Sequence, residues 1–486
     1  MNILFMASEA FPFIKTGGLA DVAGALPRAL MKRGHSVHLI VPAYQSLLAR
    51  IRAGEVPSVA LKLTTTLTLE GERVALWRTR LPGTRVTVWL VDIPAFSERS
   101  GNPYTGLDGR DWPDNHQRFF RFCQAAVAVA TNRAGLNWSA DLVHANDWQC
   151  GMACWLLRQT PSAPPSVFTI HNLAYHGLFS QPALYDLGLP DTLWQPDYLE
   201  FYGQLSFIKA GLVFAHRLTT VSPGYAREIQ TPDMGHGLDG LLRARHDDLS
   251  GILNGIDTEV WHPGRDRYLA TPYNQHRLQR KSLNTADLRK QLGLTMITEQ
   301  PLVGFVGRMV AQKGLDLLLA VLPEYLQKSA LQLVVLGKGD PHYEQAFAKL
   351  ALTFPDTVSV TLGYDEALAH RIEAGADLFL MPSLFEPCGL NQLYSLRYGA
   401  LPLVHAVGGL GDTVVDEGNP VRDNGFCFHR PQPDALSAAL SRALEMYEKD
   451  TSAWRQRQRN AMGGDYSWNQ SAAAYDQLYQ KTLSSV

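Results

Sequence analysis

Two segments of this 486-residue chain place a cation beside glycines, a combination that suits phosphate groups. Residues 15–21 (KTGGLAD) follow a short apolar run. Paired glycines let backbone N–H groups approach an anion at a helix N-terminus, and Lys15 adds a mobile positive charge. A tight strand-to-helix turn with a solvated lysine is the alternative interpretation.

The second segment, residues 307–314 (GRMVAQKG), follows another apolar run. It supplies Arg308 at the end of a predicted strand and Lys313 at the start of a predicted helix. Two cations in these places fit a diphosphate, because a guanidinium makes forked hydrogen bonds and an ammonium acts as a point charge. A solvated pair on a surface loop is the alternative.

A carboxylate, Glu386, follows the predicted strand 378–381 within residues 385–391 (FEPCGLN). At a strand's carboxyl end it would contact a sugar hydroxyl or stabilise positive charge at an anomeric carbon. A helix N-cap is the alternative. The neighbouring Cys388 is either a reactive thiol or a small buried packing residue, and the pattern favours packing.

Two more polar loops follow apolar runs, residues 144–148 (HANDW) and 171–175 (HNLAY). Their Asp147 and His171 are candidates to bind hydroxyl groups at the same rim as Lys15, although each is also a plausible structural residue. The nearby Cys150 and Cys154 are four residues apart on one helix face, a spacing that favours packing over metal binding.

The elements that must position these residues are apolar runs rich in Val, Ile, Leu and Phe, alternating with helical patterns. This alternation is typical of βαβ units in a mostly parallel sheet, where ligands bind beyond the carboxyl ends of the strands. The predicted strands are residues 2–6, 36–41, 86–91, 142–144, 166–170, 217–221, 302–306, 332–336, 358–361, 378–381 and 401–404.

The strands form two series, which predict an α/β fold of two doubly wound domains. Asn254 and an irregular polar stretch at residues 262–284 separate the series, so we place the junction near residue 250. A ligand cleft between the two domains is expected. The tail, residues 467–481, has apolar side chains at helical spacing and predicts a docked amphipathic helix.

Composition excludes several classes of protein. Lys and Arg number 44 against 46 Asp and Glu, a formal charge of -2, which predicts no nucleic-acid or membrane partner. No apolar run approaches the ~18 residues of a membrane span. Five cysteines without paired CxxC groups favour a reducing compartment, and residues 1–7 indicate a first strand rather than a signal peptide, so a cytoplasmic location is expected.

Common catalytic signatures are absent from the sequence. It contains no Asp-x-Asp triplet, which weakens a metal-bridged sugar-nucleotide mechanism. It contains neither GxSxG nor HExxH, so the common hydrolases gain no support. Residues 15–21 match neither the Walker loop nor the spaced glycines of dinucleotide-binding proteins, which argues against an NAD-dependent oxidoreductase.

Together, five motifs closely resemble bacterial glycogen synthases and plant starch synthases, the retaining glucosyltransferases of glycosyltransferase family 5. The resemblance runs in matching order from Ile3 to Trp468. Its motifs are residues 15–22 (KTGGLADV), 144–148 (HANDW), 171–175 (HNLAY), 307–308 with 312–314 (GR, QKG) and 385–394 (FEPCGLNQLY).

The resemblance implies a GT-B architecture with two Rossmann-like domains. Residues 1–250 would form the acceptor-side domain, joined by a C-terminal helix at residues 465–486, and residues 251–464 would bind the donor. The implied reaction moves glucose from ADP-glucose to the non-reducing 4-hydroxyl of an α-1,4-glucan such as glycogen. It retains the anomeric configuration and uses no metal or other cofactor.

Carried over residue by residue, the resemblance implies three groups of site residues. The catalytic group is Glu386, His171, Asp147, Arg308 and Lys313. The group that binds ADP-glucose is Lys15, Gly18, Asp21, Asn254, Gln312, Tyr364, Gly389, Leu390 and Asn391. Tyr104 would contact the acceptor, and Tyr364 would stack on adenine.

The sequence departs from related GT-B enzymes at one notable place. Many of them have a second glutamate eight residues after the first, and Tyr394 stands here, which puts the corresponding ribose contact in doubt. Two alternative functions stay open: a related transferase that uses UDP-glucose or a small sugar acceptor, and a non-catalytic glucan-binding protein.

Overall fold

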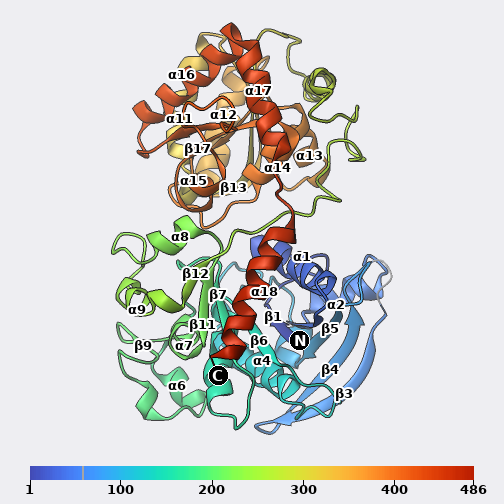
Figure 1. The fold of residues 1–486 in the computed structure, drawn as a ribbon, viewed down its shortest axis with the longest axis vertical. Coiled ribbons are helices and arrows are strands. Elements are labelled where there is room, and N and C mark those ends of the chain that lie inside the picture. The colour runs from blue at the N-terminus through green and yellow to red at the C-terminus, as the bar shows by residue number, and fades with distance from the viewer. Residues whose placement is uncertain (57–59, 486) are drawn as a thin grey trace. The chain divides into compact units, whose positions relative to one another are not determined.

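The computed structural model describes residues 1–56 and 60–485, and the chain forms two compact units (Figure 1). The first unit comprises Met1–Val221, Ala226–Asn254 and Trp468–Val486. The second comprises Ser222–Tyr225 and Gly255–Ser467. Each unit is built around its own sheet.

The first unit contains a nine-stranded sheet in the order β12-β11-β7-β6-β1-β2-β5-β4-β3. All pairs from β12 to β5 are parallel, and β4 and β3 add antiparallel strands at one edge. The strands are β1 (Asn2–Met6), β2 (Ser36–Pro42), β3 (Lys62–Leu69), β4 (Glu72–Arg80), β5 (Thr87–Asp92), β6 (Leu142–Asn146), β7 (Ser166–Ile170), β11 (Arg217–Thr220) and β12 (Leu249–Gly251). A small separate sheet contains β8 (Leu178–Ser180), β9 (Glu200–Phe201) and β10 (Gln204–Ser206).

The second unit contains six parallel strands in the order β15-β14-β13-β16-β17-β18. They are β13 (Leu302–Met309), β14 (Gln332–Gly339), β15 (Val358–Leu362), β16 (Leu378–Met381), β17 (Leu401–His405) and β18 (Phe426–Phe428). In both sheets the first strand lies in the middle and the strand order reverses beside it. This topological switch point is where ligands bind in doubly wound folds.

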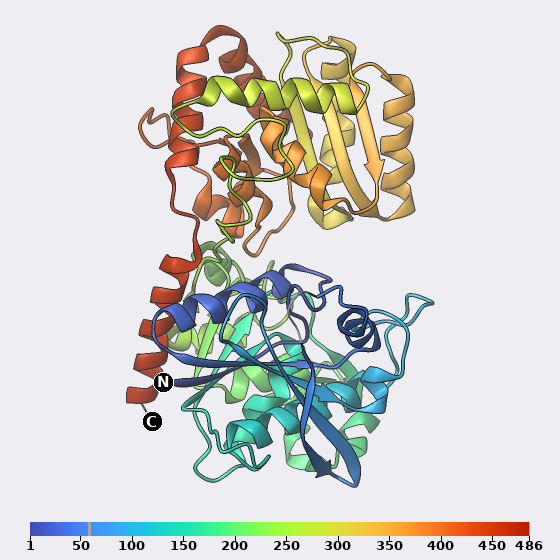
Figure 2. The same ribbon diagram turned by 90° about the vertical axis from the view of Figure 1, so that its right-hand side faces the viewer.

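Both faces of the second sheet are buried under helices (Figure 2). Along β14, Leu333 and Val335 belong to one apolar cluster, whereas Val334 and Leu336 belong to another. Because successive side chains point to opposite faces, two clusters mean two covered faces, which explains why the strands are apolar throughout.

The helices before residue 254 are α1 (Gly18–Lys32), α2 (Gln45–Arg52), α3 (Pro94–Ser97), α4 (Asn115–Ala130), α5 (Trp148–Arg158), α6 (Pro182–Asp186), α7 (Phe207–Phe214), α8 (Pro223–Glu228) and α9 (Asp239–Ala244). Those after it are α10 (Lys281–Gln291), α11 (Leu315–Gln327), α12 (Pro341–Thr353), α13 (Glu366–Gly375), α14 (Asn391–Tyr398), α15 (Gly408–Thr413), α16 (Pro433–Lys449), α17 (Thr451–Gly463) and α18 (Trp468–Ser484). Short 3-10 turns occur at η1 (Asp191–Leu193), η2 (His246–Asp248), η3 (Leu278–Arg280) and η4 (Ala311–Lys313).

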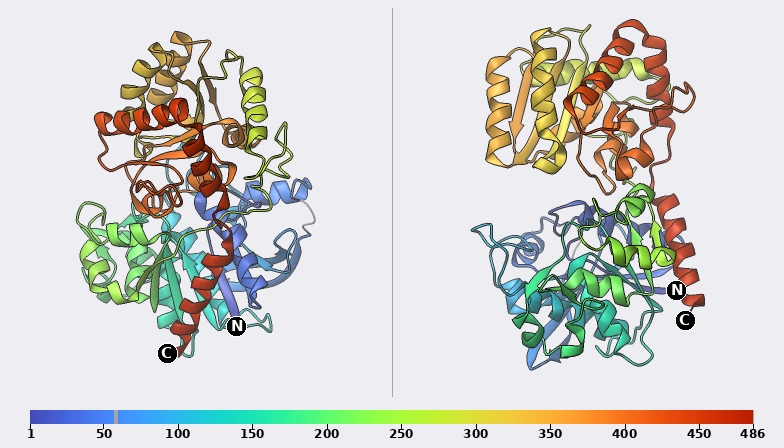
Figure 3. Two further views of the ribbon diagram at one scale, coloured as in Figure 1. Left: turned by 45° about the horizontal axis from the view of Figure 1, so that its top comes forward. Right: turned by 90° about the vertical axis from the view of Figure 1, so that its left-hand side faces the viewer.

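The predicted tail helix is α18, which packs on α1 and β7 of the first unit (Figure 3). This confirms both the amphipathic helix and its return to the N-terminal half. Each predicted strand also forms, close to its expected ends. The β3–β4 hairpin, the small sheet, β12 and β18 also form and were not predicted from the sequence. Within the described residues, no helix is long and apolar enough to cross a membrane.

Candidate active site

The loop after β1 presents Lys15 at the start of α1. The Lys15 Nζ atom lies 2.8 Å from Asp21 Oδ1, and 37% of the Lys15 side chain is exposed. A Cβ atom added at Gly18, the first residue of α1, would meet no other atom within 4 Å. The helix start therefore offers an accessible backbone and a partly exposed ammonium to an anionic ligand.

Glu9, which the sequence analysis missed, is buried under this loop. Only 3% of the residue is exposed, and its Oε2 atom accepts hydrogen bonds from the backbone N–H and the hydroxyl of Thr16. Burial raises the pKa of Glu9 above its ordinary value, although the hydrogen bonds from Thr16 oppose the shift. Glu9 lies in the loop after β1 but carries no motif of its own in the sequence.

Asp147 begins the loop after β6 with a φ of 58°, which is uncommon for a residue other than glycine. Its backbone N–H donates to the Thr169 carbonyl at 2.9 Å, and its Oδ1 atom accepts from the His171 N–H at 2.8 Å. The structure therefore brings Asp147 and His171 together, as the parallel strands predict. Burial raises the pKa of Asp147 to about 7.

The His171 ring is held by Asn146, the residue that ends β6. Asn146 Nδ2 donates to the Met6 carbonyl at 2.8 Å, so its Oδ1 atom accepts from His171 Nε2 at 2.9 Å. Burial lowers the pKa of His171 to about 3. The imidazole is therefore neutral near pH 7, and its Nδ1 atom is an acceptor suited to a hydroxyl group.

These shifts predict how activity depends on pH. We expect kcat/KM for ADP-glucose to fall as the pH drops through about 7, because Asp147 takes up a proton there and loses the charge that is expected to act on the substrate. His171, with a pKa of about 3, contributes nothing in this range. A pH profile of the wild type and of Asp147→Asn measures this, and the variant should lack the limb near pH 7.

The free energy of unfolding should depend on Asp147 in the opposite way to activity, falling as the pH rises. The native pKa of Asp147 lies above its ordinary value of 3.8, so the folded state binds the proton more tightly. Its contribution to the free energy of unfolding is present below that value and is lost as the pH rises to about 7. If Asp147→Asn still loses stability over this pH range as the wild type does, another group is responsible for the loss.

The main feature of the second unit is an ion pair between Lys313 and Glu386. Lys313 Nζ lies 2.5 Å from Glu386 Oε2, and their side chains are only 19% and 9% exposed. Ser383, which the sequence analysis missed, donates its hydroxyl to the same oxygen at 3.0 Å. Because α14 begins only at Asn391, the helix-cap alternative for Glu386 is wrong.

Other predicted residues of this unit hold the loops around the pair. Gln312 Nε2 donates to the Phe385 carbonyl at 3.2 Å, and Asn391 Nδ2 donates to the Val306 carbonyl at 2.6 Å. These side chains therefore fix the ends of β13 and η4 against the loop that carries Glu386. Gly389, with a φ of 73°, and the half-buried Leu390 complete that loop before α14.

Arg308 and Tyr364 stand apart from the ion pair. Both are exposed, Tyr364 by 78%. Arg308 lies near the end of β13 and Tyr364 lies two residues after β15, and β14 separates these two strands in the sheet. Their exposure leaves them accessible to a ligand. The structure records no ion pair for Arg308 with any residue of 1–56 or 60–485.

The remaining predicted residues lie near strand ends of the first unit. The Tyr104 hydroxyl hydrogen-bonds with Ser8 Oγ at 2.8 Å, in the loop after β1. Asn254 is 9% exposed, and its buried Oδ1 atom has no hydrogen-bond partner among the described residues. It is therefore a buried acceptor that no described residue satisfies.

Tyr394 has a packing role. Its ring stacks on Trp261 at 3.7 Å between centroids, and Trp261 stacks on His370 at the same distance on its other face. Tyr394 is 9% exposed. The place that holds a glutamate in many GT-B enzymes is therefore filled here by an aromatic stack.

Gly314 lets Lys313 and α11 approach the loop after β16. Its φ is 67°, and a Cβ atom would lie 2.0 Å from the Pro382 carbonyl oxygen. We expect Gly314→Ala to lower the free energy of unfolding by ~1 kcal/mol for the backbone conformation and by a further ~1–3 kcal/mol for the clash. Gly293 has a φ of 71° but open space around it, so Gly293→Ala should show the first cost alone. Equal losses in denaturant melting would contradict the steric argument.

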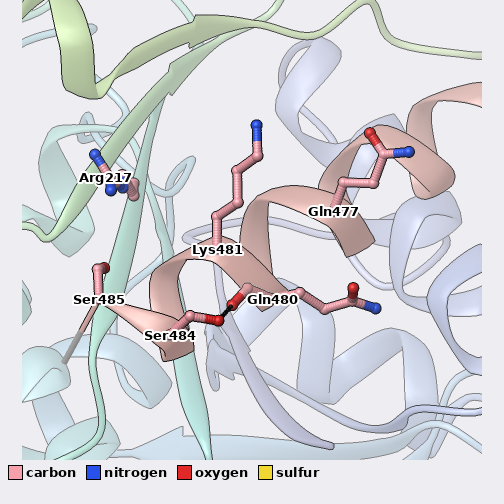
Figure 4. A pocket seen from close by; sticks show the side chains of 6 residues that line it. All are labelled: Arg217, Gln477, Gln480, Lys481, Ser484 and Ser485. Atoms are coloured by element: carbon pink, nitrogen blue, oxygen red, sulfur yellow. Dashed lines mark hydrogen bonds between the residues drawn. The ribbon is translucent and has the colours of Figure 1, made fainter.

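The described residues hold no cluster of metal ligands, and one surface hollow lies away from the polar loops. Among the described residues, no group of three or more His, Cys, Asp or Glu side chains is arranged to hold a metal ion. A hollow of about 530 Å³ lies between the start of β11 and the end of α18, lined by Arg217, Gln477, Gln480, Lys481, Ser484 and Ser485 (Figure 4). Because Arg217 begins its strand, this hollow is at the opposite end from the polar loops.

Comparisons with known proteins cover both units. The sequence family described as the starch synthase catalytic domain matches residues 2–244, and the family described as glycosyl transferases group 1 matches residues 288–461. A glycogen synthase from Cellvibrio japonicus is 57% identical over 486 residues, covering 99% of this chain and 100% of that protein. Glycogen synthase 1 from Methylococcus capsulatus is 50% identical over 491 residues, covering 100% of this chain and 97% of that protein.

Solved structures of related enzymes are similar to this chain. The catalytic domain of starch synthase IV from Arabidopsis thaliana, solved with ADP and acarbose, matches with a TM-score of 0.88 and 32% identity over 99% of both chains. A sucrose-phosphate synthase from Thermosynechococcus elongatus shares the fold, with a TM-score of 0.59 and 18% identity. With its two Rossmann-like units, this chain belongs to the glycogen synthase and starch synthase family of GT-B glycosyltransferases.

Proposed function

We propose that this enzyme transfers glucose from ADP-glucose to the non-reducing 4-hydroxyl of an α-1,4-glucan such as glycogen, with retention of configuration. The observation that carries the proposal is the buried Lys313–Glu386 pair at the switch point of the second sheet. It combines a cation for a phosphate group with a carboxylate for a sugar, at the place where doubly wound folds bind ligands. The similarity to glycogen synthases over the whole chain, at 57% and 50% identity, also supports the proposal.

The chemistry requires two kinds of charge. When the bond between C1 of glucose and the phosphate oxygen breaks, negative charge develops on ADP and positive character on the sugar ring. Arg308, Lys313 and Lys15 would stabilise the departing ADP. Glu386 and Asp147 would face the ring and stabilise its positive character.

The proposed transfer needs no nucleophile from the enzyme. The acceptor 4-hydroxyl oxygen forms the new bond to C1 on the face from which ADP departs, and the C1–O bond to phosphate breaks. The hydroxyl proton passes to the departing phosphate oxygen. Glu386 orients and stabilises the sugar and forms no covalent glucosyl intermediate.

Substrate contacts divide between the two parts of the chain. Residues 251–464 would bind the nucleotide sugar, with Tyr364 on adenine, Gln312 near the phosphates and Gly389, Leu390 and Asn391 along the glucosyl group. Residues 1–250 with 465–486 would bind the acceptor through Tyr104, while Lys15, Gly18, Asp21 and Asn254 reach the donor. Action in the cytoplasm stays a prediction.

One assay tests the proposal and its closest competitor. ADP-glucose or UDP-glucose is supplied with glycogen or maltose, and the release of nucleoside diphosphate is measured for each of the four pairings. We expect rapid release with ADP-glucose and glycogen. A preference for UDP-glucose or maltose would indicate the related transferase, and no release with any pairing would indicate a non-catalytic glucan-binding protein.

A further inference from the structure

A chain of buried hydrogen bonds joins α18 to the strands that carry Asp147 and His171. The Tyr479 hydroxyl on α18 lies 2.7 Å from His144 Nδ1, and His144 Nε2 lies 2.6 Å from the Thr169 hydroxyl. The Thr169 hydroxyl continues to Thr219 Oγ1 at 2.5 Å. None of these four residues is measurably exposed.

The hydrogen bonds of this chain depend on one another. Burial lowers the pKa of His144 to about 3, so its ring is neutral and carries a single N–H. The Tyr479 phenol is a stronger proton donor than the Thr169 hydroxyl on the other side of the ring. Tyr479 therefore donates to Nδ1, and the His144 Nε2–H donates to Thr169. The Thr169 hydroxyl then donates to Thr219. Without the Tyr479 hydroxyl, a ring nitrogen would be left without a partner in a site closed to water.

Thr169 connects this chain to the polar loops. Its carbonyl accepts the Asp147 N–H at 2.9 Å, and its hydroxyl binds the His144 ring. Asp147 has a positive φ, a strained conformation for a residue other than glycine, which persists only when surrounding contacts hold it. His171, two residues after Thr169, donates its N–H to Asp147. The orientation of Thr169 therefore bears directly on both residues.

We infer that Tyr479 is a positioning residue, whose hydroxyl acts through His144 and Thr169 to hold Asp147 and His171 in their working geometry. The inference rests on the proposed function, in which these two residues face the glucosyl group. It assigns the C-terminal helix a part in catalysis besides packing.

Loss of the hydroxyl should leave α18 docked. Asp476 on the same helix pairs with Arg33 and with His35, each at 3.1 Å, and Ser471 donates its hydroxyl to the Leu253 carbonyl. Tyr479→Phe keeps the ring and its packing. The effect of this variant therefore reports on the hydroxyl.

The experiment compares Tyr479→Phe with Thr482→Val in the full chain. Thr482 is also fully buried on α18, but its hydroxyl donates only within the helix, to the Leu478 carbonyl. We expect Tyr479→Phe to lower kcat for glycogen elongation about tenfold with KM for ADP-glucose within about twofold. Thr482→Val should keep kcat within about twofold at a similar loss of melting temperature.

Amide hydrogen exchange gives a readout independent of activity. Peptides covering residues 142–150 and 166–173 should exchange faster in Tyr479→Phe than in the wild type and in Thr482→Val. If Tyr479→Phe fails to fold, Thr169→Val and Thr169→Ser replace it, and only the valine variant should show the effect. Unchanged exchange in these peptides, or a kcat loss shared with Thr482→Val, would overturn the inference. Absence of ADP release by the wild type would instead contradict the proposed function.

Discussion

Replacement of Glu386 by Gln is expected to lower kcat about a hundredfold or more, with a smaller change in KM for ADP-glucose. Glu386 is 7% exposed and shares its Oε2 atom between Lys313 and Ser383. The amide keeps the size of the side chain but removes the negative charge that, in the proposed mechanism, stabilises the glucosyl ring as its bond to phosphate breaks. Loss of one such preorganised group typically costs ~3 kcal/mol or more of transition-state stabilisation.

Single-turnover measurements test this directly, because they separate the chemical step from glucan release. Asp416→Asn is the matched control. Asp416 is also a buried carboxylate of the second unit in an ion pair, with Arg457 at 3.0 Å, but it lies outside the proposed site. We expect this control to lower the melting temperature and to spare kcat. Full single-turnover activity of Glu386→Gln would remove Glu386 from the mechanism.

The sequence was sufficient to predict the strands and the loops that follow them. Unbroken apolar runs reflect strands buried on both faces, and this signal is local. The polar residues Asp147 and His171 were expected at one rim because both follow strands of a mostly parallel sheet, and the His171 N–H does donate to Asp147. The strand β3 is largely exposed and rich in threonine, so it lacks that apolar signal, and the apolar β18 is only three residues long.

Specific pairings could not be predicted, because they depend on how distant loops meet. Lys313 and Glu386 were assigned to different parts of the substrate, yet their side chains form an ion pair across 73 positions of the chain. Glu9 and Ser383 carry no motif of their own and become evident only through their buried hydrogen bonds. Tyr394 read as a missing ribose ligand, whereas its stacking on Trp261 depends on a residue over a hundred positions away.

The Lys313–Glu386 pair also gives a prediction in which one substitution lowers both stability and activity. Lys313→Met should lose ~3 kcal/mol or more of stability, because it leaves the buried Glu386 carboxylate without its cation. Activity should fall by at least about a hundredfold, since the same ammonium is proposed to stabilise departing ADP. Lys328→Met, which breaks an exposed pair with Glu324, should leave the denaturation midpoint unchanged, because solvent screens exposed pairs.

The double variant Lys313→Met with Glu386→Gln separates the two roles. Removing both charges eliminates the uncompensated carboxylate, so the double variant should be more stable than Lys313→Met alone. Its kcat should nevertheless stay as low as that of the less active single variant. When two groups act together in one step, losing the second after the first costs little more. Denaturant melting and single-turnover rates of all four proteins measure this cycle. Recovery of activity along with stability would mean that the pair serves only the fold, and that Lys313 and Glu386 do not act on the substrate.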